Sequence, residues 1–123
     1  HERGDLLAGL DLSGQDDRIA TVLMDLARLE TGPASVALAD TLVSSMADAG
    51  VVMNSRPRRN GNLAVLNAAD FASALIEVGF LSSDADRALL TSAQGQATIA
   101  QGIADGMIKW AADQAALAPL IRQ

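Results

Sequence analysis

One continuous apolar run that contains a carboxylate constrains the fold of this chain most. The run ALIEV occupies residues 74–78, lies between Ser73 and Gly79, and carries Glu77. A second apolar run, LAVLN, occupies residues 63–67. Short continuous apolar runs are typical of strands that are covered on both faces, as in α/β proteins. The sequence therefore predicts two strands of an α/β fold.

The connection between these two runs limits how they can pair. It spans only residues 68–73, whereas a helical crossover between parallel strands needs about a dozen residues or more. The two strands are therefore predicted to be antiparallel neighbours or not to be adjacent in the sheet. Because two strands alone leave unpaired edges, the chain is expected to be part of a larger mixed-sheet fold.

Two helices are predicted before the strands. Apolar side chains in residues 16–30 recur on one helix face, and Ser13 and Asp16 are suitable start signals. The TGP sequence at residues 31–33 is expected to break this helix. A second helix is expected to follow the break and to end near Gly50.

A short helix and a long helix are predicted after the strands. Ser83 and Asp86 have the spacing of a helix start, and Leu89 and Leu90 are expected to be buried in the short helix. The long helix is expected to bury one stripe formed by Ile99, Ile103, Met107 and Trp110. Its interior glycines, which include Gly102 and Gly106, each cost about 1 kcal/mol relative to alanine, so close helix packing is the expected compensation.

Composition excludes several classes of protein. The chain has 123 residues and a formal net charge of −6, and such a field repels phosphates, so a nucleic-acid partner is not expected. Hydrophobic residues make up 50% of the sequence, which permits a buried core. No apolar run approaches the ~20 residues that cross a bilayer, so no membrane span is expected. The absence of cysteine excludes disulfides and cysteine-based zinc sites within the chain.

Glu77 is the strongest candidate for a chemical role. An ionised carboxylate is costly to bury unless it is paired or binds a metal, and such a group suits general acid–base chemistry. It lies near the end of its predicted strand, where open α/β sheets place their ligand sites. Two structural alternatives remain open at this point, a carboxylate on a solvated strand face and a member of a structural ion pair.

The residues around Glu77 resemble a known family. The segment NGNLAVLNAADFASALIEVGFLSSDADRALL, residues 60–90, is similar to the C-terminal signature of the zinc-dependent N-acetylmuramoyl-L-alanine amidases. The following QATIAQGIADGMIKW resembles the closing helix of that family, and residues 7–31 resemble the helical insertion of its division-associated branch. The positions that match the signature are Gly61, Val65, Leu66, Ala68, Asp70, Ser73, Leu75, Glu77, Gly79, Phe80, Leu81 and Ser82.

The resemblance implies a fold and an activity. Residues 1–123 would be the C-terminal part of an amidase catalytic domain, with the helical insertion at residues 13–50 and the last strands and closing helices at residues 61–115. The parent domain would be a periplasmic cell-wall hydrolase that cleaves the amide bond between N-acetylmuramic acid and the L-alanine of the peptidoglycan stem peptide. Glu77 matches the family's catalytic carboxylate beside the metal.

The resemblance also implies a catalytic zinc ion, which this chain is not expected to bind by itself. A catalytic zinc site needs about three protein ligands, and the only histidine is His1. No metal ligand is therefore assigned within this chain. The zinc ligands are expected in an N-terminal half of the same domain, which would also be a binding partner, and this chain alone is expected to be inactive.

Regulation is a further implication of the division-associated branch. There, a helix in the insertion occludes the active site until an activator with a degenerate LytM endopeptidase domain displaces it. Glu30, expected at a helix end, is the candidate autoinhibitory carboxylate, and Asp25 is a weaker one. The alternative is that Glu30 is a solvated surface charge, as most glutamates are.

Two further alternatives concern the substrate and the class of protein. Arg56 and Arg58, in the basic cluster SRPRRNGN, are candidates for binding the carboxylates of stem peptides. The same cluster has the proline, asparagine and glycine of a solvated turn. The rival to an enzyme is a non-enzymatic regulatory or partner-binding domain that retains the amidase fold.

Overall fold

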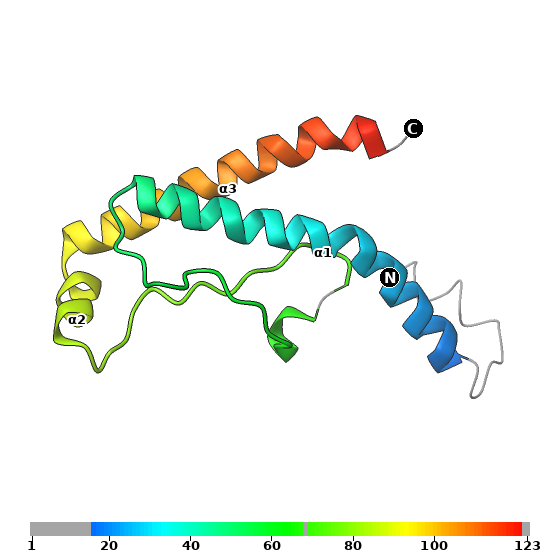
Figure 1. The fold of residues 1–123 in the computed structure, drawn as a ribbon, viewed down its shortest axis with the longest axis horizontal. Helices are drawn as coiled ribbons and strands as arrows, with labels where there is room; N and C mark the ends of the chain where they lie inside the picture. Colours follow the sequence, from blue (N-terminus) through cyan, green and yellow to red (C-terminus); the bar gives the residue numbers. More distant parts are fainter. Residues whose placement is uncertain (1–15, 68, 122–123) are drawn as a thin grey trace.

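Helices dominate the structure of this chain. The computed structural model describes residues 16–67 and 69–121, so the predicted start signal Ser13, together with His1 and Ala68, lies outside the described residues. Figure 1 shows the helices and the long irregular connection between the first and the second. The elements are the α-helices α1 (Asp16–Asp48), α2 (Asp84–Thr91) and α3 (Ala93–Ile121), and the 3-10 turn η1 (Ala64–Leu66).

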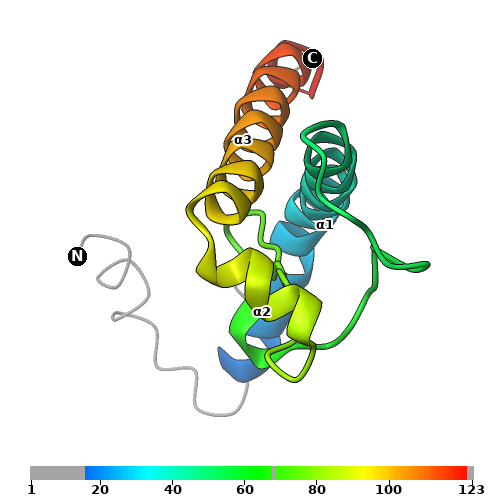
Figure 2. The same cartoon turned by 90° about the vertical axis from the view of Figure 1, so that its left-hand side faces the viewer.

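The C-terminal half of α1 packs against α3, and the two helices run in opposite directions. Gly102 of α3 faces Met46 of α1, and a Cβ atom added to this glycine would lie 2.8 Å from the Met46 Cα. One turn later, a Cβ atom on Gly106 would lie 3.0 Å from the Leu42 Cδ2. The close packing predicted for the α3 glycines is therefore confirmed. Figure 2 shows the two helices side by side, with α2 across one end.

The core of the described part is small and lies on this contact. Leu42, Met46 and Ala69 are 5%, 6% and 9% exposed and are the only buried apolar side chains that the described ranges contain. Farther along the helix pair, the Trp110 indole donates a hydrogen bond to the Ala34 carbonyl oxygen at 3.0 Å. The α1–α3 pair is thus held at one end by apolar packing and near the middle of α1 by a polar contact.

The predicted α/β fold is wrong for the described residues. Residues 16–67 and 69–121 contain no strand. Part of the first predicted strand, residues 63–67, forms the 3-10 turn, and residues 74–78 have no regular structure. A strand requires a neighbouring strand to bond its backbone groups, and the described ranges supply none. The apolar runs alone do not create a sheet.

The predicted break between two N-terminal helices is also wrong, because α1 continues through Pro33. Proline removes one helical N–H donor and its ring crowds the carbonyl of Leu29, which favours a bend. The proline ring also crowds the backbone N–H and the Cβ of the preceding residue, and Gly32 removes the Cβ part of this clash because it has no Cβ. Figure 1 shows the N-terminal part of α1 leaning away from the line of its C-terminal part.

The predicted helix boundaries at Gly50 and Ser83 are confirmed. Gly50 has a φ of 100° and donates to the Ala47 carbonyl at 3.0 Å, while Val51 donates to the Met46 carbonyl at 3.0 Å. This is the Schellman arrangement, in which glycine adopts the left-handed conformation that ends a helix. Ser83 caps α2 by accepting a hydrogen bond from the Asp86 N–H.

None of the side chains predicted to be buried is fully buried, and Leu90, Ile99, Ile103 and Trp110 are half-buried. Leu89 of α2 is 50% exposed and Met107 of α3 is 55% exposed. The glycine face of α3, rather than the full apolar stripe, makes the closest contact with α1. Among the helices that the structure describes, none is long and apolar enough to cross a membrane.

We predict that Gly102→Val destabilises the protein by about 2 kcal/mol, because the new methyl groups would overlap the α1 backbone at Met46. The matched control is Ala104→Val, which introduces the same side chain at an exposed position of α3 and should cost only about 0.5 kcal/mol. Urea unfolding followed by circular dichroism measures both. Equal losses in the two variants would contradict the close contact.

Candidate functional site

Residues 73–80 form a strap, the Glu77 strap, that runs from α1 to α2 and carries Glu77 near its middle (Figure 1). At the α1 end, the Ser73 N–H donates to the Ser35 hydroxyl oxygen at 3.0 Å. At the α2 end, the Phe80 N–H donates to a carboxylate oxygen of Asp86 at 2.9 Å. Side chains of two different helices therefore hold the two ends of the strap.

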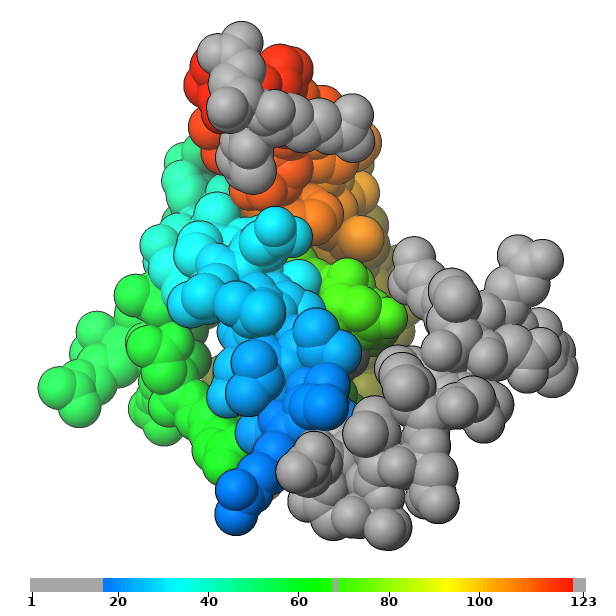
Figure 3. Space-filling view, turned by 90° about the vertical axis from the view of Figure 1, so that its right-hand side faces the viewer, coloured from blue at the N-terminus to red at the C-terminus, as the bar shows by residue number. Residues whose placement is uncertain are grey.

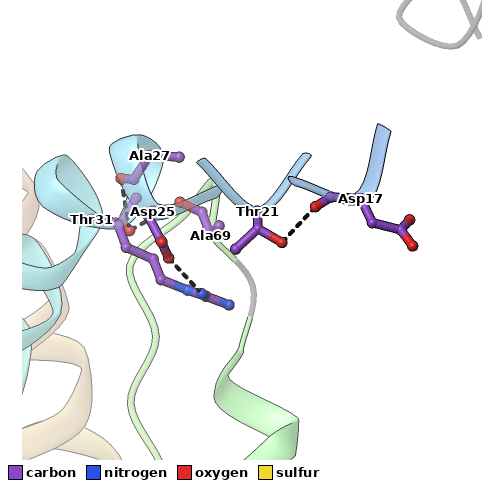
Figure 4. A network of polar contacts seen from close by, with 7 residues as sticks. Asp17, Thr21, Asp25, Ala27, Thr31 and Ala69 are labelled. Atoms are coloured by element: carbon purple, nitrogen blue, oxygen red, sulfur yellow. Dashed lines mark hydrogen bonds and ion pairs between the residues drawn. The ribbon is translucent and has the colours of Figure 1, made fainter. Parts of the chain in front are cut away.

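The α1 anchor has a second hydrogen bond before the strap begins. The Thr31 hydroxyl lies 2.9 Å from the Ala69 carbonyl oxygen and 3.2 Å from the Ala27 carbonyl oxygen (Figure 4). Thr31 and Ser35 are one helical turn apart on the same face of α1. Since Thr31 bonds to Ala69 and Ser35 bonds to Ser73, residues 69–73 run alongside α1 in the same direction.

The α2 anchor combines a cap with close packing. Ser83 accepts the Asp86 N–H at 3.3 Å, which satisfies a free donor in the first turn of α2. A Cβ atom added at Gly79 would lie 3.2 Å from the Asp86 Cβ and 3.3 Å from the Leu90 Cδ1. Glycine lets the strap pass close to α2, so the carboxylate of Asp86 can reach the Phe80 N–H.

Glu77 itself is exposed. The expected buried carboxylate in a strand is therefore wrong for this structure. Among the described residues, no hydrogen bond or ion pair of the Glu77 side chain is seen, which also leaves the structural ion pair without support here. Its carboxylate is accessible to solvent.

The described residues do not fit a zinc ion. They contain no group of three or more histidine, cysteine, aspartate or glutamate side chains that could hold a metal. A catalytic zinc site uses about three protein ligands and one open position. Any zinc bound to the domain must therefore use ligands beyond the described residues.

The two candidate regulatory carboxylates both lie on α1. Glu30 is exposed and lies within the continuous helix, so its expected place at a helix end is wrong. Asp25 is exposed and pairs with Arg28 at 3.4 Å, one turn along the same helix. Within the described part of the chain, no hydrogen bond or ion pair joins either side chain to the Glu77 strap.

The arginine cluster follows the C-terminal end of α1. Arg58 pairs with Asp40 of α1, with 2.7 Å between the Nε atom and a carboxylate oxygen, and it donates to Asn60 at 3.2 Å. The backbone N–H of Arg56 donates to the Asn54 side chain at 2.9 Å, as in a turn. A shallow surface depression is lined by Arg56, Arg58, Arg59 and Asn60.

Sequence reasoning missed the anchors of the strap. Asp86 was identified only as a helix-start residue, and Thr31 and Ser35 were not singled out for any contact. Each α1 hydroxyl bonds a residue 38 positions away in the sequence, so no local pattern reveals the pairing. The sequence offers one hint of the α1 anchor, which is the pair of hydroxyl residues Thr31 and Ser35 on either side of Gly32 and Pro33.

The strap and the helices that hold it fall within one family match. Residues 20–109 match the family described as N-acetylmuramoyl-L-alanine amidase, a group of amide hydrolases that act on peptidoglycan. The match covers more than half of the chain and includes the strap and the α1 anchor. The chain therefore belongs to this family. No curated protein and no solved structure matches this chain.

We predict that Ser83→Ala weakens α2 by about 1 kcal/mol, because it removes the cap acceptor of the Asp86 N–H. Amide hydrogen exchange at Asp86 should become about fivefold faster. Ser82→Ala is the matched control, because Ser82 is exposed and no hydrogen bond of its side chain is seen within the described ranges. Similar exchange rates in the two variants would contradict the capping role.

Proposed function

We propose that this chain supplies the proton-handling carboxylate of a peptidoglycan amidase, and that this carboxylate is Glu77. The observation that carries the proposal is the family match over residues 20–109, which includes the Glu77 strap. The reaction would be hydrolysis of the amide bond between N-acetylmuramic acid and the L-alanine of the stem peptide. The exposure of Glu77 is compatible with access by a large polymeric substrate.

In this proposal Glu77 acts first as a base and then as an acid. A carboxylate oxygen takes a proton from water as the water oxygen bonds to the carbonyl carbon of the muramic acid lactyl group. The carboxyl group then gives this proton to the L-alanine nitrogen as the carbon–nitrogen bond breaks. The products are a muramic acid with a free carboxylate and a peptide with a free amino terminus.

We propose that the zinc implied by the family resemblance is held outside the described residues. The reason is the donor set, since the described part of the chain has no group of three potential ligands. The N-terminal part of the same catalytic domain is the proposed source of these ligands. A periplasmic location follows from the proposed substrate, which is the cell wall.

The N-terminal half of α1 is the proposed autoinhibitory element, with Glu30 as its candidate carboxylate. Figure 3 shows this half, in blue and cyan, as a ridge on the face toward the viewer. Such an apolar ridge is suited to packing against another surface, and a LytM-type activator of the division-associated branch is the proposed partner that displaces it. Its exposed apolar side chains, each 43–72% exposed, are Ile19, Val22, Leu23, Met24, Leu26 and Leu29.

Arg56 and Arg58 remain proposed contacts for the carboxylates of stem peptides. Both belong to the lining of one surface depression, and a guanidinium matches a carboxylate with two parallel hydrogen bonds. Arg58 already pairs with Asp40, so it would have to exchange this partner for the substrate. Arg56 is therefore the better of the two candidates.

A non-enzymatic regulatory or partner-binding domain is the second candidate function. The exposed apolar side chains in the N-terminal half of α1 favour it, because such a surface suits packing against a partner. The two candidates predict different results with peptidoglycan. A binding domain would bind the polymer without releasing free amino termini, whereas the enzyme would release them.

We predict that Glu77→Gln in the complete amidase domain abolishes hydrolysis, with a loss of at least about a hundredfold in kcat, because the amide cannot accept the proton from water. The matched control is Asp113→Asn, which neutralises an exposed carboxylate of α3 that pairs with Lys109. Release of free L-alanine amino termini from purified peptidoglycan measures both. Turnover by Glu77→Gln at the rate of the unmodified protein would refute the catalytic assignment.

We predict that deleting residues 16–30 raises the basal activity of the complete domain without an activator, because the proposed occluding helix is removed. Glu30→Gln should raise it in the same direction, while Asp48→Asn, at the other end of α1, should not. A folded deletion variant that is no more active than the parent would count against autoinhibition.

A further inference from the structure

The Glu77 strap is short enough for its anchors to determine where Glu77 lies. Glu77 is four residues from Ser73 and three residues from Phe80. A chain spans at most about 3.6 Å per residue, so the Glu77 Cα stays within about 14 Å of the Ser73 backbone and about 11 Å of the Phe80 backbone. Fixing both ends therefore keeps the Glu77 backbone in the space between its anchors on α1 and α2.

Both anchors use a side-chain oxygen that accepts a backbone N–H. Ser35 accepts from Ser73 at 3.0 Å, and Asp86 accepts from Phe80 at 2.9 Å. The strap lacks the backbone ladder that would fix a strand, because residues 73–80 form no regular structure. Each end therefore relies in part on one side-chain acceptor, beside the Thr31–Ala69 hydrogen bond at the α1 end and the hydrogen bond from the Ser83 N–H to the Phe80 carbonyl at the α2 end.

We infer that Ser35 and Asp86 are positioning residues, which hold the strap so that the Glu77 carboxylate meets the reacting amide in a productive geometry. This inference rests on the proposed function of Glu77. Displacement of a catalytic group by about 1 Å can reduce a rate about a hundredfold even when substrate binding is retained. Loss of an anchor should therefore lower kcat more than it changes KM.

The α1 anchor also connects the strap to the bend in α1. Thr31 and Ser35 lie on either side of Pro33, and they bind Ala69 and Ser73 through hydrogen bonds of 2.9 and 3.0 Å. The two hydrogen bonds therefore join the chain that leads into the strap to the part of α1 that contains Pro33.

The test compares anchor variants in the complete amidase domain. Ser35→Ala and Asp86→Ala each remove one acceptor, while Ser35→Thr and Asp86→Asn each retain an oxygen that can accept the same N–H. Ser44→Ala and Asp84→Ala are the matched controls. Ser44 is an exposed serine of α1, and Asp84 lies in the first turn of α2 and pairs with Arg87 rather than with the strap.

Two measurements are made on each variant. Amide hydrogen exchange should become about tenfold faster at Ser73 in Ser35→Ala and at Phe80 in Asp86→Ala, because each variant removes the acceptor of that N–H. For hydrolysis of muramoyl-peptide substrate, kcat should fall by about tenfold to a hundredfold with KM within about twofold. Ser35→Thr and Asp86→Asn should restore both quantities, and the controls should leave them unchanged.

The outcomes separate this inference from the proposed function. If Glu77→Gln is inactive while Ser35→Ala and Asp86→Ala keep the parental kcat, the positioning role is refuted and the catalytic role of Glu77 stands. If Glu77→Gln is as active as the parent, the proposed function fails. A loss of activity that the conservative variants do not restore, with unchanged helical content, also overturns the positioning role.

Discussion

The rest of the described structure depends on the contact between α1 and α3. Gly102 and Gly106 let α3 approach the α1 backbone at Met46 and Leu42, which are two of the three buried apolar side chains in the described residues. Because the core is so small, each atom at this contact contributes a larger share of the stability than it would in a larger domain. The helix pair provides the rigid frame from which α1 presents its hydroxyls to the Glu77 strap.

The chemistry proposed for Glu77 depends on a segment with no regular structure. The strap is held by Ser35 at one end and by Asp86 at the other, and Glu77 lies exposed between them. A catalytic group on such a segment is positioned by a few specific hydrogen bonds and is therefore open to regulation through them. One of these bonds is accepted by Ser35, two residues after Pro33 in α1, so the helix is joined directly to the strap.

Local signals in the sequence predicted the features that depend on neighbouring residues. The end of α1 at Gly50, the cap at Ser83 and the glycine packing of α3 each follow from the conformational properties of one or two residues. The strand at residues 74–78 could not be judged locally, because an apolar run becomes a strand only beside a partner strand. The Ser35 and Asp86 anchors were missed for a similar reason, since they join different segments. The expected break at Pro33 is wrong because α1 continues through it, and the lack of a Cβ at Gly32 removes part of the clash that usually precedes a proline.

The central claim is that this chain carries part of the site of a muramoyl-peptide amidase. Mass spectrometry of purified muropeptides after incubation with the complete domain tests it most directly. The account predicts two products, a saccharide with a free lactyl carboxylate and a stem peptide that begins with L-alanine. Muropeptides that remain intact, or that are cut only within the peptide or the glycan, would contradict it.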